Sequence, residues 1–73
     1  MVQEKIIAII AEKLEVPVKD ISAASSFDGM KVDSLAMVEI MLAIEDEYDI
    51  TIEEAEGIET VADITAYVEQ KLA

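Results

Sequence analysis

The stretch DSLAMVEIMLAIEDEYDI, residues 33–50, decides the fold of this chain. Most of it is apolar on nearly every side of a helix, with an interruption at Glu39, and its end is strongly acidic. A helix of this kind lies at the centre of a fold or presents an apolar face to something else. The pattern predicts a helix from Ser34 to Tyr48. Its N-cap is Asp33 or Ser34, since both residue types favour that position.

Two amphipathic helices are expected on either side of this central helix. The first ends before Pro17, because proline disfavours the helical conformation in the residue before it. Its apolar stripe consists of Val2, Ile6, Ile9, Ile10 and Leu14, widened by Ile7. The last helix is expected to begin at Thr60 as the N-cap, with Asp63 completing a capping box. Its inward stripe consists of Val61, Ile64, Val68 and Leu72.

The connections between these helices differ in length and in expected structure. A turn-like loop of roughly 16 residues precedes Asp33, and loops that long are usually functional or disordered. Three apolar residues are expected to pin it to the core, namely Ile21, Phe27 and Val32. The alternating residues 48–52 could form a strand, but a lone strand leaves its backbone unpaired, so an extended connector is preferred. A short helix is expected at residues 53–56, ended by Gly57.

The whole chain, residues 1–73, is therefore predicted to be one all-α domain. It is a four-helix bundle with three main helices, one short third helix and a long loop between helices one and two. Glu4 and Lys5 interrupt the apolar N-terminus, so a signal peptide or membrane span is not expected there. The expected location is the cytoplasm, or an organelle matrix if a transit peptide is removed.

The charge of the chain is strongly negative and unevenly distributed. There are 17 acids against 5 bases, a net charge of −12, and no basic residue stands between Lys31 and Lys71. Such a field repels nucleic acid and anionic membranes and attracts basic protein surfaces. Residues 45–47 are acids at a helix C-terminus, where they oppose the helix dipole. They indicate recognition of a partner, although plain solubility is the alternative explanation.

The residue inventory argues against catalysis by the chain itself. It contains no cysteine and no histidine, and a serine needs a nearby base to become a useful nucleophile. The same absence excludes disulfides and metal sites built from histidine or cysteine. A calcium-loop pattern does not occur either. We therefore expect neither an enzyme nor a metal site.

One constellation remains as a candidate site, Val32-Asp33-Ser34-Leu35, where the long loop enters the most apolar helix. A phosphodiester on Ser34 would face the unpaired backbone N–H groups and the positive dipole end of that helix. A serine at such a junction is also accessible to a modifying enzyme. The simpler alternative is that the motif only caps the helix.

At these residues the chain resembles the acyl carrier protein family, over nearly its whole length. The resembling segments are residues 26–27, 33–35, 38–40, 42–50, 53–56 and 58–61. The resemblance implies that a phosphopantetheinyl transferase attaches 4′-phosphopantetheine covalently to Ser34, within a motif that includes Asp33 and Leu35. The terminal thiol of this arm would carry acyl intermediates of fatty-acid or polyketide synthesis as thioesters.

The resemblance also assigns roles along the central helix. Residues at matching positions dock onto basic patches of acyl-loading and acyl-processing enzymes, namely Glu39, Glu45 and Asp46. Three others would line or flank the space for the acyl chain, with ordinary core packing as the alternative, namely Val38, Met41 and Ile44. A monomer is expected, with no nucleic acid and no membrane as partner.

Three departures from the family pattern bear on the pathway. Met30-Lys31 stands where the family commonly has Leu-Gly, so Gly29 is expected to make the turn from a shifted position. Ala36 stands where fatty-acid carriers often have an acid, and the connector after Tyr48 is shorter than usual. Ala36, together with the positive charge of Lys31 on the other side of Ser34, favours a dedicated carrier of a specialised pathway. The alternatives are an aminoacyl or peptidyl carrier, and an acidic module that binds a basic partner without modification.

Overall fold

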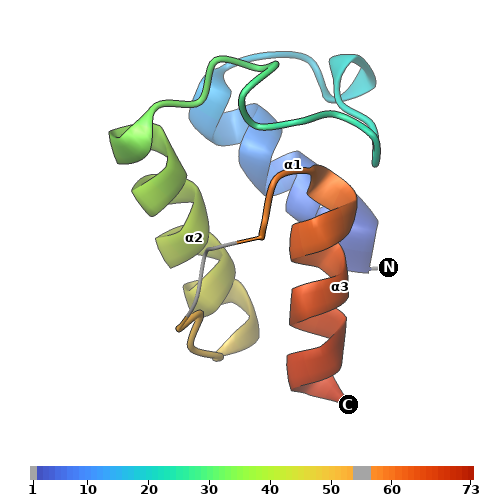
Figure 1. Cartoon of the computed structure of the whole chain (residues 1–73), viewed down its shortest axis with the longest axis vertical. Coiled ribbons are helices and arrows are strands. Elements are labelled where there is room, and N and C mark those ends of the chain that lie inside the picture. The colour runs from blue at the N-terminus through green and yellow to red at the C-terminus, as the bar shows by residue number, and fades with distance from the viewer. Residues whose placement is uncertain (1, 54–56) are drawn as a thin grey trace.

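The computed structural model describes residues 2–53 and 57–73, and this part of the chain is helical. Its elements are α1 (Val2–Leu14), the 3-10 helix η1 (Val18–Asp20), α2 (Ser34–Tyr48) and α3 (Val61–Leu72). α1 packs against both α2 and α3 (Figure 1). The all-helical prediction is confirmed, and the expected bounds of the central helix are those of α2. The short helix expected at residues 53–56 falls mainly on 54–56, outside the described residues.

α1 and α2 both end in a C-cap with a left-handed residue. Glu15 follows α1 with a φ of 57°, and Asp49 follows α2 with a φ of 54°. Beyond each of these left-handed residues, an N–H reaches back five residues to a helix carbonyl, from Val16 to Ala11 at 3.1 Å and from Ile50 to Glu45 at 3.2 Å. This pattern satisfies carbonyl groups that a helix end leaves free.

The start of α3 is the predicted capping box. The Thr60 hydroxyl accepts from the Asp63 N–H at 3.2 Å, while the Asp63 carboxylate accepts from the N–H groups of Glu59 at 3.0 Å and Thr60 at 3.1 Å. The backbone bonds from Glu59 and Thr60 favour the ionised carboxylate, so they lower the pKa of Asp63. The box fixes where α3 begins.

The long loop before α2 is tied to the start of α3. Carbonyls of the loop accept from two N–H groups of the first turn of α3, Ser25 from Val61 at 3.0 Å and Ala23 from Ala62 at 2.9 Å. Helix N-termini leave such groups without intrahelical partners. In the loop itself, Phe27 is buried, as predicted. The loop therefore belongs to the packed structure and gives α2 a fixed starting point.

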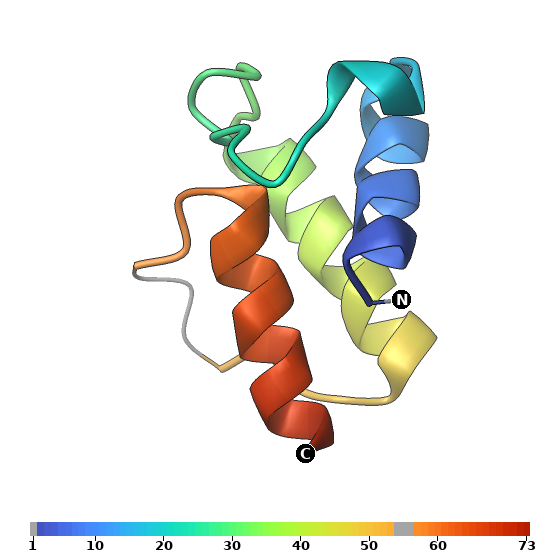
Figure 2. The same ribbon diagram turned by 90° about the vertical axis from the view of Figure 1, so that its right-hand side faces the viewer.

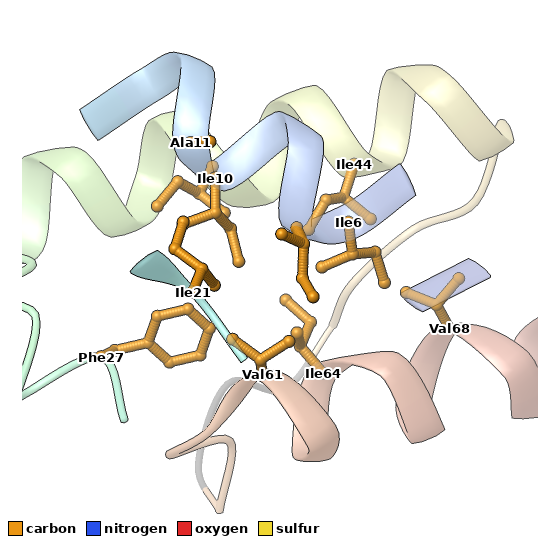
Figure 3. Packing of buried hydrophobic residues seen from close by; sticks show 11 residues of the cluster. Ile6, Ile10, Ala11, Ile21, Phe27, Ile44, Val61, Ile64 and Val68 are labelled. Carbon is orange, nitrogen blue, oxygen red and sulfur yellow. The ribbon is translucent and has the colours of Figure 1, made fainter. Parts of the chain in front are cut away.

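The apolar core lies between the three α-helices (Figure 3). Its members are Ile6, Ile7, Ile10, Ala11, Ile21, Phe27, Ile40, Ile44, Val61, Ile64 and Val68. α2 and α3 both pack on α1, but no Cα atom of α2 lies within 8 Å of a Cα atom of α3. The interior between these two helices is therefore filled by side chains such as those of Ile44 and Ile64 (Figure 3).

Thr65 of α3 provides a test of this core. It is only 5% exposed, and its hydroxyl has no hydrogen-bond partner among the described residues. A buried hydroxyl without a partner costs about 1–3 kcal/mol. Thr65→Val keeps the shape and removes the hydroxyl, so we expect the free energy of unfolding to rise by about 1 kcal/mol or more in urea titrations.

The control for this substitution is Thr65→Ser. Serine keeps the hydroxyl and loses a buried methyl group, which lowers stability by about 1 kcal/mol. A Thr65→Val chain that is less stable than the unchanged chain would show that the hydroxyl has a favourable partner.

Candidate functional site

The site is built at the N-terminus of α2, where Asp33 is the cap. Asp33 has extended backbone, and its carboxylate accepts from the Ala36 N–H at 2.8 Å. Its carbonyl accepts from the Met37 N–H at 2.9 Å. Of the two candidate caps, Asp33 fills the position, and Ser34 is the first helical residue with an exposed side chain. The N–H groups of Ser34 and Leu35 remain available for an anion, because helix geometry gives them no partner.

The turn that leads into this cap is made by Lys31. Lys31 has a φ of 60°, whereas Gly57 is the glycine with positive φ among the described residues. The expectation that Gly29 makes the turn from a shifted position is therefore wrong. Gly29 has another role: its N–H donates to the Ser26 hydroxyl at 2.8 Å, and a Cβ at Gly29 would lie 2.6 Å from that oxygen.

Lys31 therefore occupies a conformation that favours glycine, and this gives a direct prediction. The left-handed region costs a residue with a Cβ about 1–2 kcal/mol. Lys31→Gly should raise the free energy of unfolding by about 1 kcal/mol, part of the gain being offset by the freedom of glycine in the unfolded chain. Urea titrations of the two chains measure the difference.

Lys31→Ala is the matched control, because it removes the charge and keeps the Cβ. We expect no comparable gain from alanine. Equal stabilisation by glycine and alanine would assign the effect to the lysine charge instead of the backbone.

α2 presents an exposed apolar face beside Ser34. Leu35 is 70% exposed, Val38 51% and Leu42 58%. The spacing of these residues places them on one side of the helix. The helix therefore combines a buried face, which includes Ile40 and Ile44, with an exposed apolar face, and we call Leu35, Val38 and Leu42 the apolar strip. Ser34 lies at one end of the strip.

The three predicted docking acids lie in two different environments. Glu39 and Asp46 are exposed, and both line a groove between α1 and α2 together with Glu12 and Lys13. Glu45 is half-buried, and its carboxylate accepts from the Ile52 N–H at 2.6 Å. Glu39 and Asp46 are therefore free to meet a partner, whereas Glu45 already holds a backbone group.

The three residues predicted to line or flank the space for an acyl chain differ in burial. Ile44 is fully buried in the core, Met41 is half-buried, and Val38 belongs to the exposed strip. The fully buried partner of Ile44 on α2 is Ile40, which sequence reasoning did not single out. Its four-residue spacing from Ile44 was the available signal.

The described residues contain no group of three or more potential metal-ligating side chains. Within the same part of the chain, no helix has the length and apolar character needed to cross a membrane.

Comparison with known proteins identifies the family of the chain. Residues 4–68 match the family described as phosphopantetheine attachment site. The acyl carrier protein of Streptococcus thermophilus (strain CNRZ 1066) is 43% identical over 68 residues, covering 93% of this chain and 92% of the relative. That of Streptococcus pyogenes serotype M1 is 41% identical with the same coverage. The acyl carrier protein of Exiguobacterium sp. (strain ATCC BAA-1283 / AT1b) is 47% identical over 66 residues, covering 86% and 84%.

The chain belongs to the phosphopantetheine-dependent acyl carrier protein family. The prediction of an acyl carrier that uses a 4′-phosphopantetheine arm is confirmed by this membership. The two alternatives, an aminoacyl or peptidyl carrier and an unmodified interaction module, are not favoured.

Proposed function

We propose that Ser34 carries the 4′-phosphopantetheine arm, and that the chain presents acyl thioesters on this arm to partner enzymes without catalysing a step itself. The observation that carries the proposal is the placement of Ser34. Its side chain is exposed at the first position of α2, and Asp33 fixes that position through the Ala36 N–H. The arm's phosphodiester fits there, since a helix N-terminus favours a negative group.

Loading of the arm needs a second protein. The Ser34 oxygen forms a new bond to the phosphate of phosphopantetheine, the nucleotide part of coenzyme A leaves, and the hydroxyl proton must go to a base. The neighbouring carboxylate, that of Asp33, accepts from the Ala36 N–H as the helix cap. The proposal assigns the base to the phosphopantetheinyl transferase. The arm also supplies the thiol that a chain without cysteine lacks.

The surface around Ser34 suits basic partner enzymes with an apolar centre. The apolar strip begins at Leu35, next to Ser34, and Glu39 and Asp46 are exposed on the same helix. Apolar contacts with charged groups around them are typical of protein interfaces. We propose this face of α2 as the docking surface for the transferase and for acyl-processing enzymes. The cytoplasmic location, the monomeric state and the specialised pathway stay predictions.

The proposal is tested by loading the chain in solution. The purified chain is incubated with a phosphopantetheinyl transferase and coenzyme A, and its intact mass is measured. We expect a gain of one phosphopantetheine per chain and one free thiol in a thiol assay. The Streptococcus thermophilus relative serves as the positive control. No gain of mass under conditions that load that control would contradict the proposal and favour an unmodified interaction module.

A further inference from the structure

A pocket of about 370 Å³ opens between the end of α1, η1 and the loop that leads to α2. Figure 2 shows these segments at one end of the molecule, the end at which α2 begins. We call this space the loop pocket. It is separate from the groove between α1 and α2 that contains Glu39 and Asp46. The residues that line the loop pocket are Leu14, Val16, Asp20, Ile21, Met30 and Lys31.

Backbone hydrogen bonds fix the walls of the loop pocket. The Val16 N–H donates to a carbonyl of α1 at 3.1 Å. In η1, the Asp20 N–H donates to the Pro17 carbonyl at 3.0 Å, and in the loop the Lys31 N–H donates to the Asp28 carbonyl at 3.0 Å. A site whose walls are already ordered binds a ligand at a lower entropic cost than a site that must first be ordered.

The loop pocket combines an apolar wall with one positive and one negative side chain. Lys31 supplies the positive charge and Asp20 the negative charge. In the described part of the chain, ion pairs are formed by Lys5 and Lys71, but none is formed by Lys31. The Lys31 amine is therefore available to a phosphate, for which lysine is a common partner in proteins. The residues of the apolar wall are Leu14, Val16, Ile21 and Met30.

Lys31 is close enough to Ser34 to meet the first group of an arm attached there. The two residues are three positions apart, and three residues span at most about 11 Å of chain. The phosphodiester is that first group, and the Lys31 amine stands on a flexible four-carbon side chain that can reach it. Lys31 also keeps a left-handed backbone, with a φ of 60°, which lysine does not favour. Such strained residues are concentrated at functional sites.

We propose that the loop pocket is the resting site of the phosphopantetheine arm, with the phosphodiester paired with Lys31. The inference rests on the proposed function, in which Ser34 carries the arm. The groups that follow the phosphate along the arm are a dimethyl carbon, a hydroxyl and an amide. The apolar wall suits the methyl groups, and the Asp20 carboxylate can accept from the hydroxyl or the amide N–H. Small-molecule sites have volumes of about 300–1,000 Å³, so the loop pocket suits this first half of the arm and leaves the thiol outside.

The covalent tether allows a weak pocket to be occupied. A group on a short flexible tether has an effective concentration in the millimolar range. Half occupancy therefore needs only a millimolar dissociation constant. An exposed charge pair contributes little, so loss of the Lys31 charge should lower the occupancy by about two- to fivefold. Addition of 1 M salt should have a similar effect, because the screening length falls to about 3 Å.

The test uses the full chain, isotope-labelled and loaded with unlabelled phosphopantetheine. Nuclear Overhauser effects from the dimethyl protons of the arm to the methyl groups of Leu14 and Met30 report occupancy. We expect these effects in the unchanged chain, and effects about two- to fivefold weaker in Lys31→Gln, which removes the charge and keeps a long side chain. Lys19→Gln is the matched control and should keep the full intensity, since Lys19 is an exposed lysine outside the pocket lining.

Two results would overturn the proposal. One is a loaded chain in which the dimethyl protons contact neither Leu14 nor Met30, whether the arm lies in solvent or on the apolar strip of α2. The other is an equal intensity in Lys31→Gln and the unchanged chain, which would show that the phosphodiester is not paired with Lys31.

Free 4′-phosphopantetheine, added at millimolar concentration to the unloaded chain, makes the result independent of loading. It should shift the amide resonances of Ile21, Met30 and Lys31, and pantetheine, which lacks the phosphate, should shift them several-fold less. Equal shifts with the two compounds, or shifts confined to other residues, would contradict the inference. A chain that binds the free molecule in this pocket but gains no mass from a transferase would contradict only the proposed function.

Discussion

A Ser34→Ala chain is expected to fold like the unchanged chain and to gain no phosphopantetheine from a transferase that loads the unchanged chain completely. Ser34 is exposed, and the cap of α2 belongs to Asp33. The change in the free energy of unfolding should therefore stay within about 0.5 kcal/mol, as for most surface substitutions. Intact mass measures loading, and circular dichroism with urea titration measures folding.

The serines of the loop before α2 are the alternative attachment sites. The Ser25 hydroxyl accepts from the Ser22 N–H at 2.9 Å, and the Ser26 hydroxyl accepts from the Gly29 N–H at 2.8 Å. These hydroxyls hold the loop together, whereas Ser34 stands at a helix start. Gain of mass by the Ser34→Ala chain would assign the arm to one of the loop serines and overturn the placement.

Asp33→Ala separates the cap from the attachment oxygen. Loss of an N-cap costs about 0.5–2 kcal/mol, so this chain should be less stable than Ser34→Ala. It keeps the Ser34 hydroxyl and should still be loaded, more slowly because the start of α2 frays. Complete loss of loading in a folded Asp33→Ala chain would give Asp33 a direct role in the transfer.

The helices were predictable because local interactions define their ends. α1 ends at the left-handed Glu15, shortly before Pro17, and the Thr60 and Asp63 pair starts α3, so both helix ends are set within a few residues of the chain. Buried loop residues were predictable for a similar reason, because Phe27 is a large apolar residue in a polar stretch. Periodicity and capping chemistry carry this information without any knowledge of the tertiary structure.

The left-handed backbone at Lys31 and the choice of the inner face of α2 could not be predicted in the same way. Lys31 adopts a left-handed conformation, which lysine does not favour. Glycine favours that conformation, so the sequence pointed to the nearby Gly29 instead. Val38 is expected to line or flank the space for an acyl chain, with core packing as the alternative, and its side chain is 51% exposed. Within residues 35–44 the one charged residue is Glu39, so periodicity does not distinguish the inner face of this part of α2, and the packing against α1 decides it.

The engagement of Glu45 depends on tertiary structure most of all. Its bond to Ile52 spans seven residues and forms only because Asp49 turns the chain back beneath the end of α2. In the sequence, Glu45 is one acid in a run of three. A substitution at Glu45 therefore also removes a hydrogen bond of the Ile52 backbone, and a docking experiment must use other acids.

Reversal of the two exposed acids tests docking without that complication. A Glu39→Lys and Asp46→Lys chain is expected to be loaded by the transferase at least about tenfold more slowly at low salt. Fields of this kind raise association rates by about 10- to 1,000-fold, although each exposed pair contributes only about 0.2–1 kcal/mol to binding. Loading rates are read from intact mass over time at limiting carrier concentration, where association controls the rate.

The matched control reverses two exposed acids outside α2, Glu4 on α1 and Glu69 on α3. Both double variants have the same net charge, so a difference between them reports the position of the charges. We expect the control to be loaded at nearly the rate of the unchanged chain. The defect of the Glu39→Lys and Asp46→Lys chain should shrink in 1 M salt, where the screening length falls to about 3 Å. If both variants slow equally, total charge governs the encounter and α2 is not the docking surface. If neither slows, the apolar strip beginning at Leu35 would have to direct docking on its own.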